Sequence, residues 1–175
     1  MIASAQTSSE RSLIDGFDQE FARLQVCSCS LIDATPAEML YEKPATCDNE
    51  LVSGSIGEYV IRSAGVVEQT FGGITTNLWD DPFEWTLPET LNSRERVKEY
   101  LAEVEQTRQR AFVSFDCDQN LLKKVAAPSG NMRPLVSLLL DTLVRSVSFQ
   151  GRAVALAEMF SIAPSDRFII SRSVK

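Results

Sequence analysis

Apolar residues recur at three- and four-residue spacings in four long segments of the chain, which is the pattern of amphipathic helices. The first segment covers residues 9–34. Directly after it, residues 35–38 (Thr-Pro-Ala-Glu) combine a capping threonine, a proline at the first helical position and a glutamate three residues after the cap. We therefore expect a short extra helix there. The second long helix opens at a similar capping box, residues 55–58 (Ser-Ile-Gly-Glu), and extends to about residue 78.

Two further amphipathic segments follow, at residues 93–115 and 133–159. The last segment is apolar over a wide face, which predicts that it is the most buried helix. The connections at residues 41–54 and 79–92 are longer than closure requires, and we expect them to pack over one end of the helices. Together these patterns predict an all-α fold, an up-down-type four-helix bundle whose neighbouring helices run antiparallel.

The length of 175 residues suits one domain with its own core. We expect a disordered or loosely ordered N-terminus at residues 1–9, the bundle at residues 10–160, and a C-terminal tail at residues 161–175 that packs on the bundle. Hydrophobic residues make up 44% of the chain and charged residues 23%, which are ordinary values for a globular protein.

The charge balance bears on the partners. A net charge of −7 and a pI near 4.7 disfavour a nucleic-acid partner, because phosphate backbones attract basic surfaces. The longest apolar run, residues 135–140, is far too short to span a bilayer, and the polar first residues lack the pattern of a signal peptide. We therefore predict a cytoplasmic protein with no nucleic-acid partner and no membrane partner.

Histidine is absent from the chain. Its absence removes the usual general base near neutral pH, the imidazole-based catalytic triads and the commonest zinc ligand. Cys27 and Cys29 point about 200° apart on a helix, which suits neither one metal nor one disulfide. For these two thiols and for Cys47 and Cys117 we predict the reduced form, and we predict no cofactor and no metal.

Several short motifs carry a resemblance to a known family. Residues 35–40 (Thr-Pro-Ala-Glu-Met-Leu) and Pro44 match its connection between the first two helices, and residues 55–58 match the start of its second helix. Gln150-Gly151 stands where its fourth helix carries a glycine. In these motifs and in the order of its helices, the chain resembles the DinB/YfiT-like superfamily of four-helix bundles over residues 10–160.

The resemblance implies a site that this chain has changed. Many members of the superfamily bind a divalent metal through one histidine of the second helix and a His-x-x-x-His pair of the fourth helix. The matching positions hold Arg62, Arg145 and Phe149. Arginine stays protonated and phenylalanine has no lone pair, so neither residue type can bind a metal. The chain is thus expected to be a divergent member without the metal site, and the metal-dependent activities of its relatives do not carry over.

Two interpretations of Arg62 and Arg145 remain open. In the first, the two guanidinium groups line a pocket and bind an anionic small molecule, which Tyr59 and Gln150 help to orient. In the second, they form ion pairs within their own helices, with Glu58 and with Asp141, each four residues earlier in the chain.

Two functions follow from these interpretations. The sequence favours a non-catalytic binding or interaction protein, with a homodimer through helix faces as a possible assembly, because no nucleophile–base pair is recognisable. The alternative is an enzyme or carrier for an anionic small molecule in the pocket lined by Arg62 and Arg145. The aromatic residues Trp79, Phe83 and Trp85 form either a lid over a partner or a cap on the core.

Overall fold

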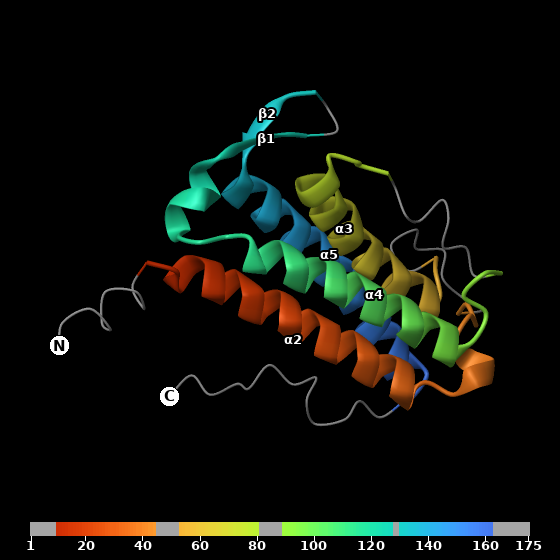
Figure 1. Cartoon of the computed structure of the whole chain (residues 1–175). Coiled ribbons are helices and arrows are strands. Elements are labelled where there is room, and N and C mark those ends of the chain that lie inside the picture. The colour runs from red at the N-terminus through yellow and green to blue at the C-terminus, as the bar shows by residue number, and fades with distance from the viewer. Residues whose placement is uncertain (1–9, 45–52, 81–88, 128–129, 163–175) are drawn as a thin grey trace, which may run out of the picture.

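The computed structural model describes residues 10–44, 53–80, 89–127 and 130–162, and most of these residues are helical. In this part of the chain, the fold consists of long helices, as predicted: α2 (Ser12–Ala34), α3 (Ile56–Thr76), α4 (Arg94–Val113) and α5 (Leu135–Met159) (Figure 1). The described residues also form two short 3-10 helices, η1 (Ala37–Met39) and η4 (Asp118–Leu122). The all-α class and the short extra helix after α2 are therefore confirmed. None of the described helices has the length and apolar content of a membrane span.

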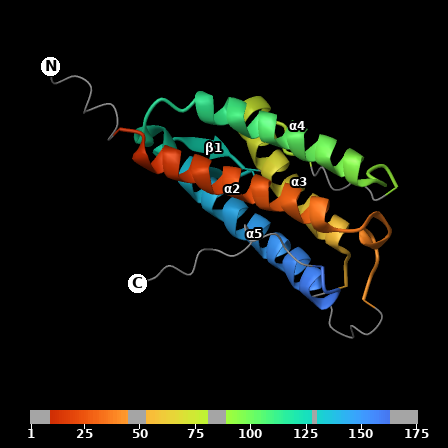
Figure 2. The same cartoon turned by 90° about the horizontal axis from the view of Figure 1, so that it is seen from below.

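The helices α2 and α5 run in one direction, and α3 and α4 run in the opposite direction (Figures 1 and 2). α4 packs against α2 and α3, and α5 packs against the same two helices. The pairs α2–α4 and α3–α5 are thus antiparallel, whereas the pairs α3–α4 and α2–α5 are parallel neighbours. This differs from the expectation that all neighbouring helices run antiparallel. The length of the connection between α3 and α4 permits this arrangement. Residues 77–93 separate the two helices, and at about 3.4 Å per extended residue this is enough chain to reach from the end of α3 back to the level of its start, so that α4 can run in the same direction.

Side-chain caps set the helix ends. At the start of α3, Ser55 Oγ accepts a hydrogen bond from Glu58 N at 3.2 Å, and Glu58 Oε2 accepts one from Ser55 N at 2.8 Å. The predicted capping box is thus present. The start of α2 is held by a distant residue: Asp118 of η4 accepts hydrogen bonds from Leu13 N at 3.1 Å and from Ile14 N at 3.0 Å. A carboxylate at this position also complements the positive end of the helix dipole.

The core lies between the four long helices, and α3 contributes the largest share of it. Buried residues make up 13 of the 21 residues of α3 but 8 of the 25 residues of α5. An aromatic cluster joins three helices, with the ring of Phe71 5.2 Å from that of Phe21 and 5.3 Å from that of Phe112. The expectation that the last helix is the most buried was wrong, because α5 is apolar on its outer side as well as on its core side.

A small hairpin between η4 and α5 was not predicted. It consists of β1 (Lys124–Ala126) and β2 (Met132–Pro134), which pair antiparallel with Val125 opposite Arg133. Strands of three residues are too short to show an alternating pattern in the sequence. The extended piece expected at residues 168–170 lies outside the described residues.

Trp79 packs on the end of α3. A Cβ on Gly73 would collide with the indole ring of Trp79, and the Trp79 carbonyl accepts a hydrogen bond from Gln69 Nε2 at 3.3 Å. For Trp79, the interpretation as a cap on the core agrees with this packing. Phe83 and Trp85 lie outside the described residues.

Candidate functional site

The two arginines predicted to line a pocket, Arg62 on α3 and Arg145 on α5, are both exposed. Each stands one residue before a serine of the Ser63–Ser146 contact between these helices. One residue corresponds to a rotation of about 100° around a helix, so both side chains are turned away from that contact. Their exposure differs from the expected interior position, and their anion-binding role stays a prediction.

The acidic residues expected to pair with these arginines have other partners. Glu58 Oε1 lies 3.2 Å from Lys43 Nζ. Asp141 Oδ2 lies 2.5 Å from Nη2 of Arg133, which belongs to β2. The pairing of Asp141 with Arg145, which the four-residue spacing suggested, is thus replaced by an ion pair between α5 and the hairpin.

Phe149, which stands at one of the degenerate metal positions, packs against the core together with the predicted ligand residue Tyr59. The guanidinium carbon of Arg152 lies 5.8 Å from the centre of the Tyr59 ring and 5.6 Å from that of Phe149. These distances are those of cation–π contacts. The phenol oxygen of Tyr59 also accepts a hydrogen bond from Gly54 N at 3.1 Å. Tyr59 and Phe149 therefore hold an arginine that the sequence analysis did not single out.

The remaining predicted ligand residue, Gln150, joins α5 to α2. Its Nε2 donates to Leu24 O at 2.9 Å and to Ser28 Oγ at 3.0 Å. The helices α3 and α5 are joined in the same manner, because the side chain of Ser63 donates to Ser146 O at 2.9 Å and the side chain of Ser146 donates to Ser63 O at 3.2 Å. These hydrogen bonds, of which the two between Ser63 and Ser146 are fully buried, fix the relative positions of the helices.

The most unusual interior group is Arg108 of α4, which is 3% exposed. Its Nε donates to Glu105 Oε2 at 2.8 Å and its Nη2 to Glu105 Oε1 at 2.6 Å. Nη1 forms an ion pair with Asp18 of α2 and donates to the Asp18 carbonyl at 3.3 Å. The guanidinium group also lies 5.4 Å from the centre of the Phe112 ring. Both carboxylates thus compensate the desolvation of the charge, which otherwise disfavours burial.

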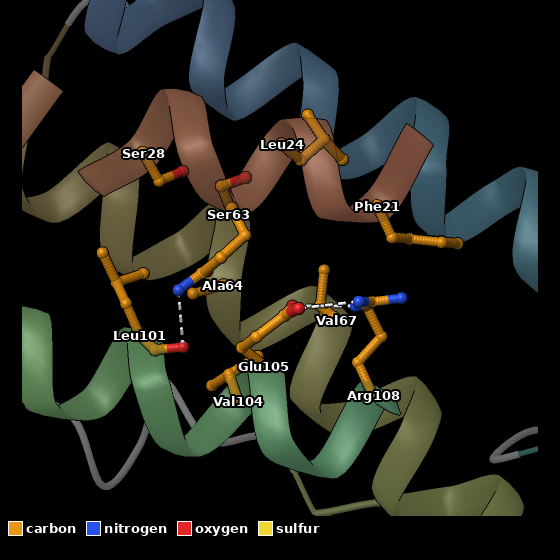
Figure 3. Close-up of a pocket in the computed structure, with 11 residues that line it drawn as sticks. Phe21, Leu24, Ser28, Ser63, Ala64, Val67, Leu101, Val104, Glu105 and Arg108 are labelled. Carbon is orange, nitrogen blue, oxygen red and sulfur yellow. Dashed lines mark hydrogen bonds and ion pairs between the residues drawn. The ribbon is translucent and has the colours of Figure 1, made fainter. Parts of the chain in front are cut away.

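A small cavity adjoins this ion pair, between α2, α3 and α4 (Figure 3). Its volume is about 20 Å³, which is room for one water molecule. Polar and charged groups on its wall are those of Gln25, Ser28, Ser63, Glu105 and Arg108, while the other lining residues are apolar. The Gln25 side chain donates to Leu101 O at 2.9 Å across the cavity. In the described ranges, no three His, Cys, Asp or Glu side chains gather in a way that could hold a metal ion.

Glu68 of α3 is a partly buried acid whose pKa is shifted. Tyr100 Oη of α4 donates to its Oε2 at 2.7 Å. Burial raises the pKa of Glu68, the hydrogen bond from Tyr100 opposes this effect, and the charge of Glu103 adds to it. The pair joins α3 to α4 and places a carboxyl group of raised pKa beside a phenol.

The described cysteines are free thiols that are half-buried. Burial raises the pKa of Cys27 and, together with the charge of Asp33, that of Cys29. A raised pKa lowers the fraction of reactive thiolate at both positions. Cys117 is also free, and Cys47 lies outside the described residues.

The largest feature that the sequence analysis missed lies on the surface. The outer face of α5, as we name it here, consists of five exposed residues at helical spacing: Leu140, Val144, Val147, Gly151 and Ala155. Its three large side chains are 48%, 68% and 49% exposed in that order. Single exposed apolar residues are common on protein surfaces, but a continuous apolar face is typical of a binding surface.

Sequence signals for both missed features exist. Arg108 continues the apolar stripe of Leu101, Val104 and Ala111 at three- and four-residue spacings, and Glu105 stands three residues before it. A charged residue inside such a stripe, with an acid one turn away, indicates a buried ion pair. For α5, the signal is the width of its apolar face. A helix with one buried side needs only about 100° of apolar surface, so the additional apolar residues of α5 indicate a second, exposed face.

Comparison with protein-family models, with curated proteins and with solved structures found no match to this chain.

Proposed function

We propose that this protein is a non-catalytic interaction protein, a four-helix bundle of the DinB/YfiT-like type that binds a protein partner through the outer face of α5. The observation that carries the proposal is the exposure of Leu140, Val144 and Val147 in one line on a helix whose opposite side forms the core. Burying one such side chain contributes about 1.5 to 3 kcal/mol to the free energy of binding, so a partner that covers this face is held by the removal of apolar surface from water.

The interior contacts support the same proposal. The polar residues that a ligand could use inside the bundle are engaged in holding helices together: Gln150 joins α5 to α2, Ser63 joins α3 to α5, and Arg108 joins α4 to α2. The cavity beside Arg108 has room for a water molecule, whereas sites for small organic ligands measure about 300 Å³ or more.

The family assignment belongs to the proposal as well. The capping box at Ser55 and the short helix η1 after α2 occur where the resemblance places them. Of the degenerate metal positions, Phe149 supports this assignment, because it packs on the core beside Arg152 and so serves a structural purpose. A cytoplasmic location accords with this interaction role and is part of the same proposal.

In-cell photo-crosslinking tests the proposed function. A photoreactive phenylalanine analogue replaces Val144 on the outer face of α5 or, as the matched control, Ala102 on the exposed side of α4. The proposal expects covalent protein adducts from position 144 at several times the yield from position 102. Equal yields at the two positions would contradict it.

A further inference from the structure

We propose that the partner of the outer face of α5 is a second copy of this chain, and that the two α5 helices pack antiparallel with Val147 at the twofold axis. This inference rests on the proposed function, because it names the partner of the same surface. The outer face spans the fifteen steps from Leu140 to Ala155, about 22 Å of helix at 1.5 Å per residue.

The shape of the face is self-complementary about Val147. In an antiparallel pair centred there, Val144 lies beside Gly151 of the second copy, and Leu140 lies beside Ala155 of the second copy. Nothing lies within 4 Å of the position that a Cβ on Gly151 would take, so the glycine leaves an open notch in the face. The large residues at one end of the face therefore meet the small residues at the other end, which allows two helices to approach closely.

The charges beside the face select the same orientation. Asp141 and Arg152 are eleven residues apart, which is about three turns, so they lie along one edge of the helix. A parallel pair would place this edge of one helix beside the opposite edge of the other, so Asp141 and Arg152 would not meet across the interface. The antiparallel pair centred on Val147 instead brings the exposed Asp141 near Arg152 of the second copy, at both ends of the interface. Opposite charges at such positions favour one orientation over the other.

A second copy is the partner that this pattern fits, because a twofold interface requires each surface to complement itself. One twofold axis at Val147 brings Val144 of one copy to the notch at Gly151 of the other, and also brings Asp141 of one copy near Arg152 of the other. A partner of unrelated sequence would need none of these internal relationships.

Sedimentation equilibrium of the full chain tests the inference. We expect the unmodified protein to sediment as a dimer, with twice its chain mass of 19.4 kDa, at a protein concentration of about 100 µM. Val147→Glu should weaken the dimer by at least about tenfold, since it places two carboxylates at the axis. The matched control is Val113→Glu, at an 81% exposed position on α4, and it should leave the dimer unchanged.

Charge reversal then tests the orientation. Asp141→Arg and Arg152→Asp should each weaken the dimer several-fold, and the chain carrying both changes should regain the affinity of the unmodified protein. Double substitution without recovery would overturn the antiparallel register. A monomer at all concentrations, or a dimer that Val147→Glu leaves intact, would overturn the second copy as partner. If such a monomer still formed adducts with other proteins from position 144, the proposed function would stand and this inference alone would fail.

Discussion

Arg108 and Glu105 form a two-point ion pair inside the protein, one turn apart on α4, with nitrogen–oxygen distances of 2.8 and 2.6 Å. The pair stands beside the cavity between α2, α3 and α4, and Asp18 completes it from the neighbouring helix. An ion pair of this kind adds little stability over an apolar core, but breaking it leaves a buried charge without its partner.

Glu105→Gln should therefore lower the free energy of unfolding by about 2 to 4 kcal/mol, because Arg108 then loses its charged partner on α4. The control is Glu99→Gln, which removes an exposed partner of Arg96 on the same helix and should change stability by less than about 0.5 kcal/mol. Urea unfolding of both variants measures the difference. Equal, small effects of the two substitutions would show that Arg108 is not held as described.

Asp118 should make the protein sensitive to acid. Desolvation opposes its ionisation, but the hydrogen bonds from Ile14 N, Leu13 N and Ser12 outweigh this effect and lower its pKa. A carboxyl group with a lowered pKa in the folded state stabilises the fold above its unfolded pKa of about 4, and this contribution is lost as the pH falls through the folded pKa. Asp118→Asn should reduce the melting temperature at neutral pH and flatten its fall below pH 4. A parallel shift of the whole pH profile would count against this role.

Glu68 should act in the opposite sense. Its pKa is raised in the folded state, so the charged form costs stability when the pH lies above the folded pKa, and this cost disappears below the unfolded pKa of about 4.3. Glu68→Gln keeps an acceptor for Tyr100 Oη and should raise the melting temperature at pH 7. The gain should vanish near pH 4. A melting temperature that falls at pH 7 would indicate that the carboxylate itself stabilises the pair.

How far the sequence determines this fold can be argued from its helices. The predicted starts and ends lie within about three residues of those of α2, α3, α4 and α5, because capping residues and apolar periodicity are local signals. The parallel arrangement of α3 and α4 was missed, since a long connection permits either direction. Periodicity also cannot tell which apolar side of α5 faces the core, and so its outer face was taken for a buried one.

The candidate site shows the same limit. Aligning Arg62 and Arg145 with metal positions of a family assumed that both side chains face the interior, but each is one residue out of the buried register that Ser63 and Ser146 occupy. Arg108 was missed because it is charged and was therefore assigned to the polar side of α4, although its spacing from Leu101, Val104 and Ala111 places it on the apolar side. A shift of one residue along a helix rotates a side chain by about 100°, which is enough to move it from the interior to the surface.

Neighbouring glycines at the end of α3 offer a matched pair of substitutions. Gly73→Ala should destabilise the protein by about 1 to 3 kcal/mol, since the new methyl group displaces the Trp79 ring. Gly72→Ala has no neighbour closer than 3.8 Å and should stabilise the helix by about 0.5 to 1 kcal/mol. Tryptophan fluorescence in a chain that also carries Trp85→Phe reports the displacement. An unchanged emission spectrum in Gly73→Ala would contradict the packing of Trp79.

The central claim is that a partner covers the outer face of α5, and thiol labelling of the assembled protein in cells tests it most directly. Val147→Cys and, separately, Val113→Cys are exposed to a membrane-permeant maleimide, and mass spectrometry follows the labelling of each position alongside the native thiols. The account predicts that position 147 is labelled at least about tenfold more slowly than position 113, because the partner excludes the reagent. Equal labelling rates at the two positions would show that the outer face of α5 stays open to solvent and would contradict the account.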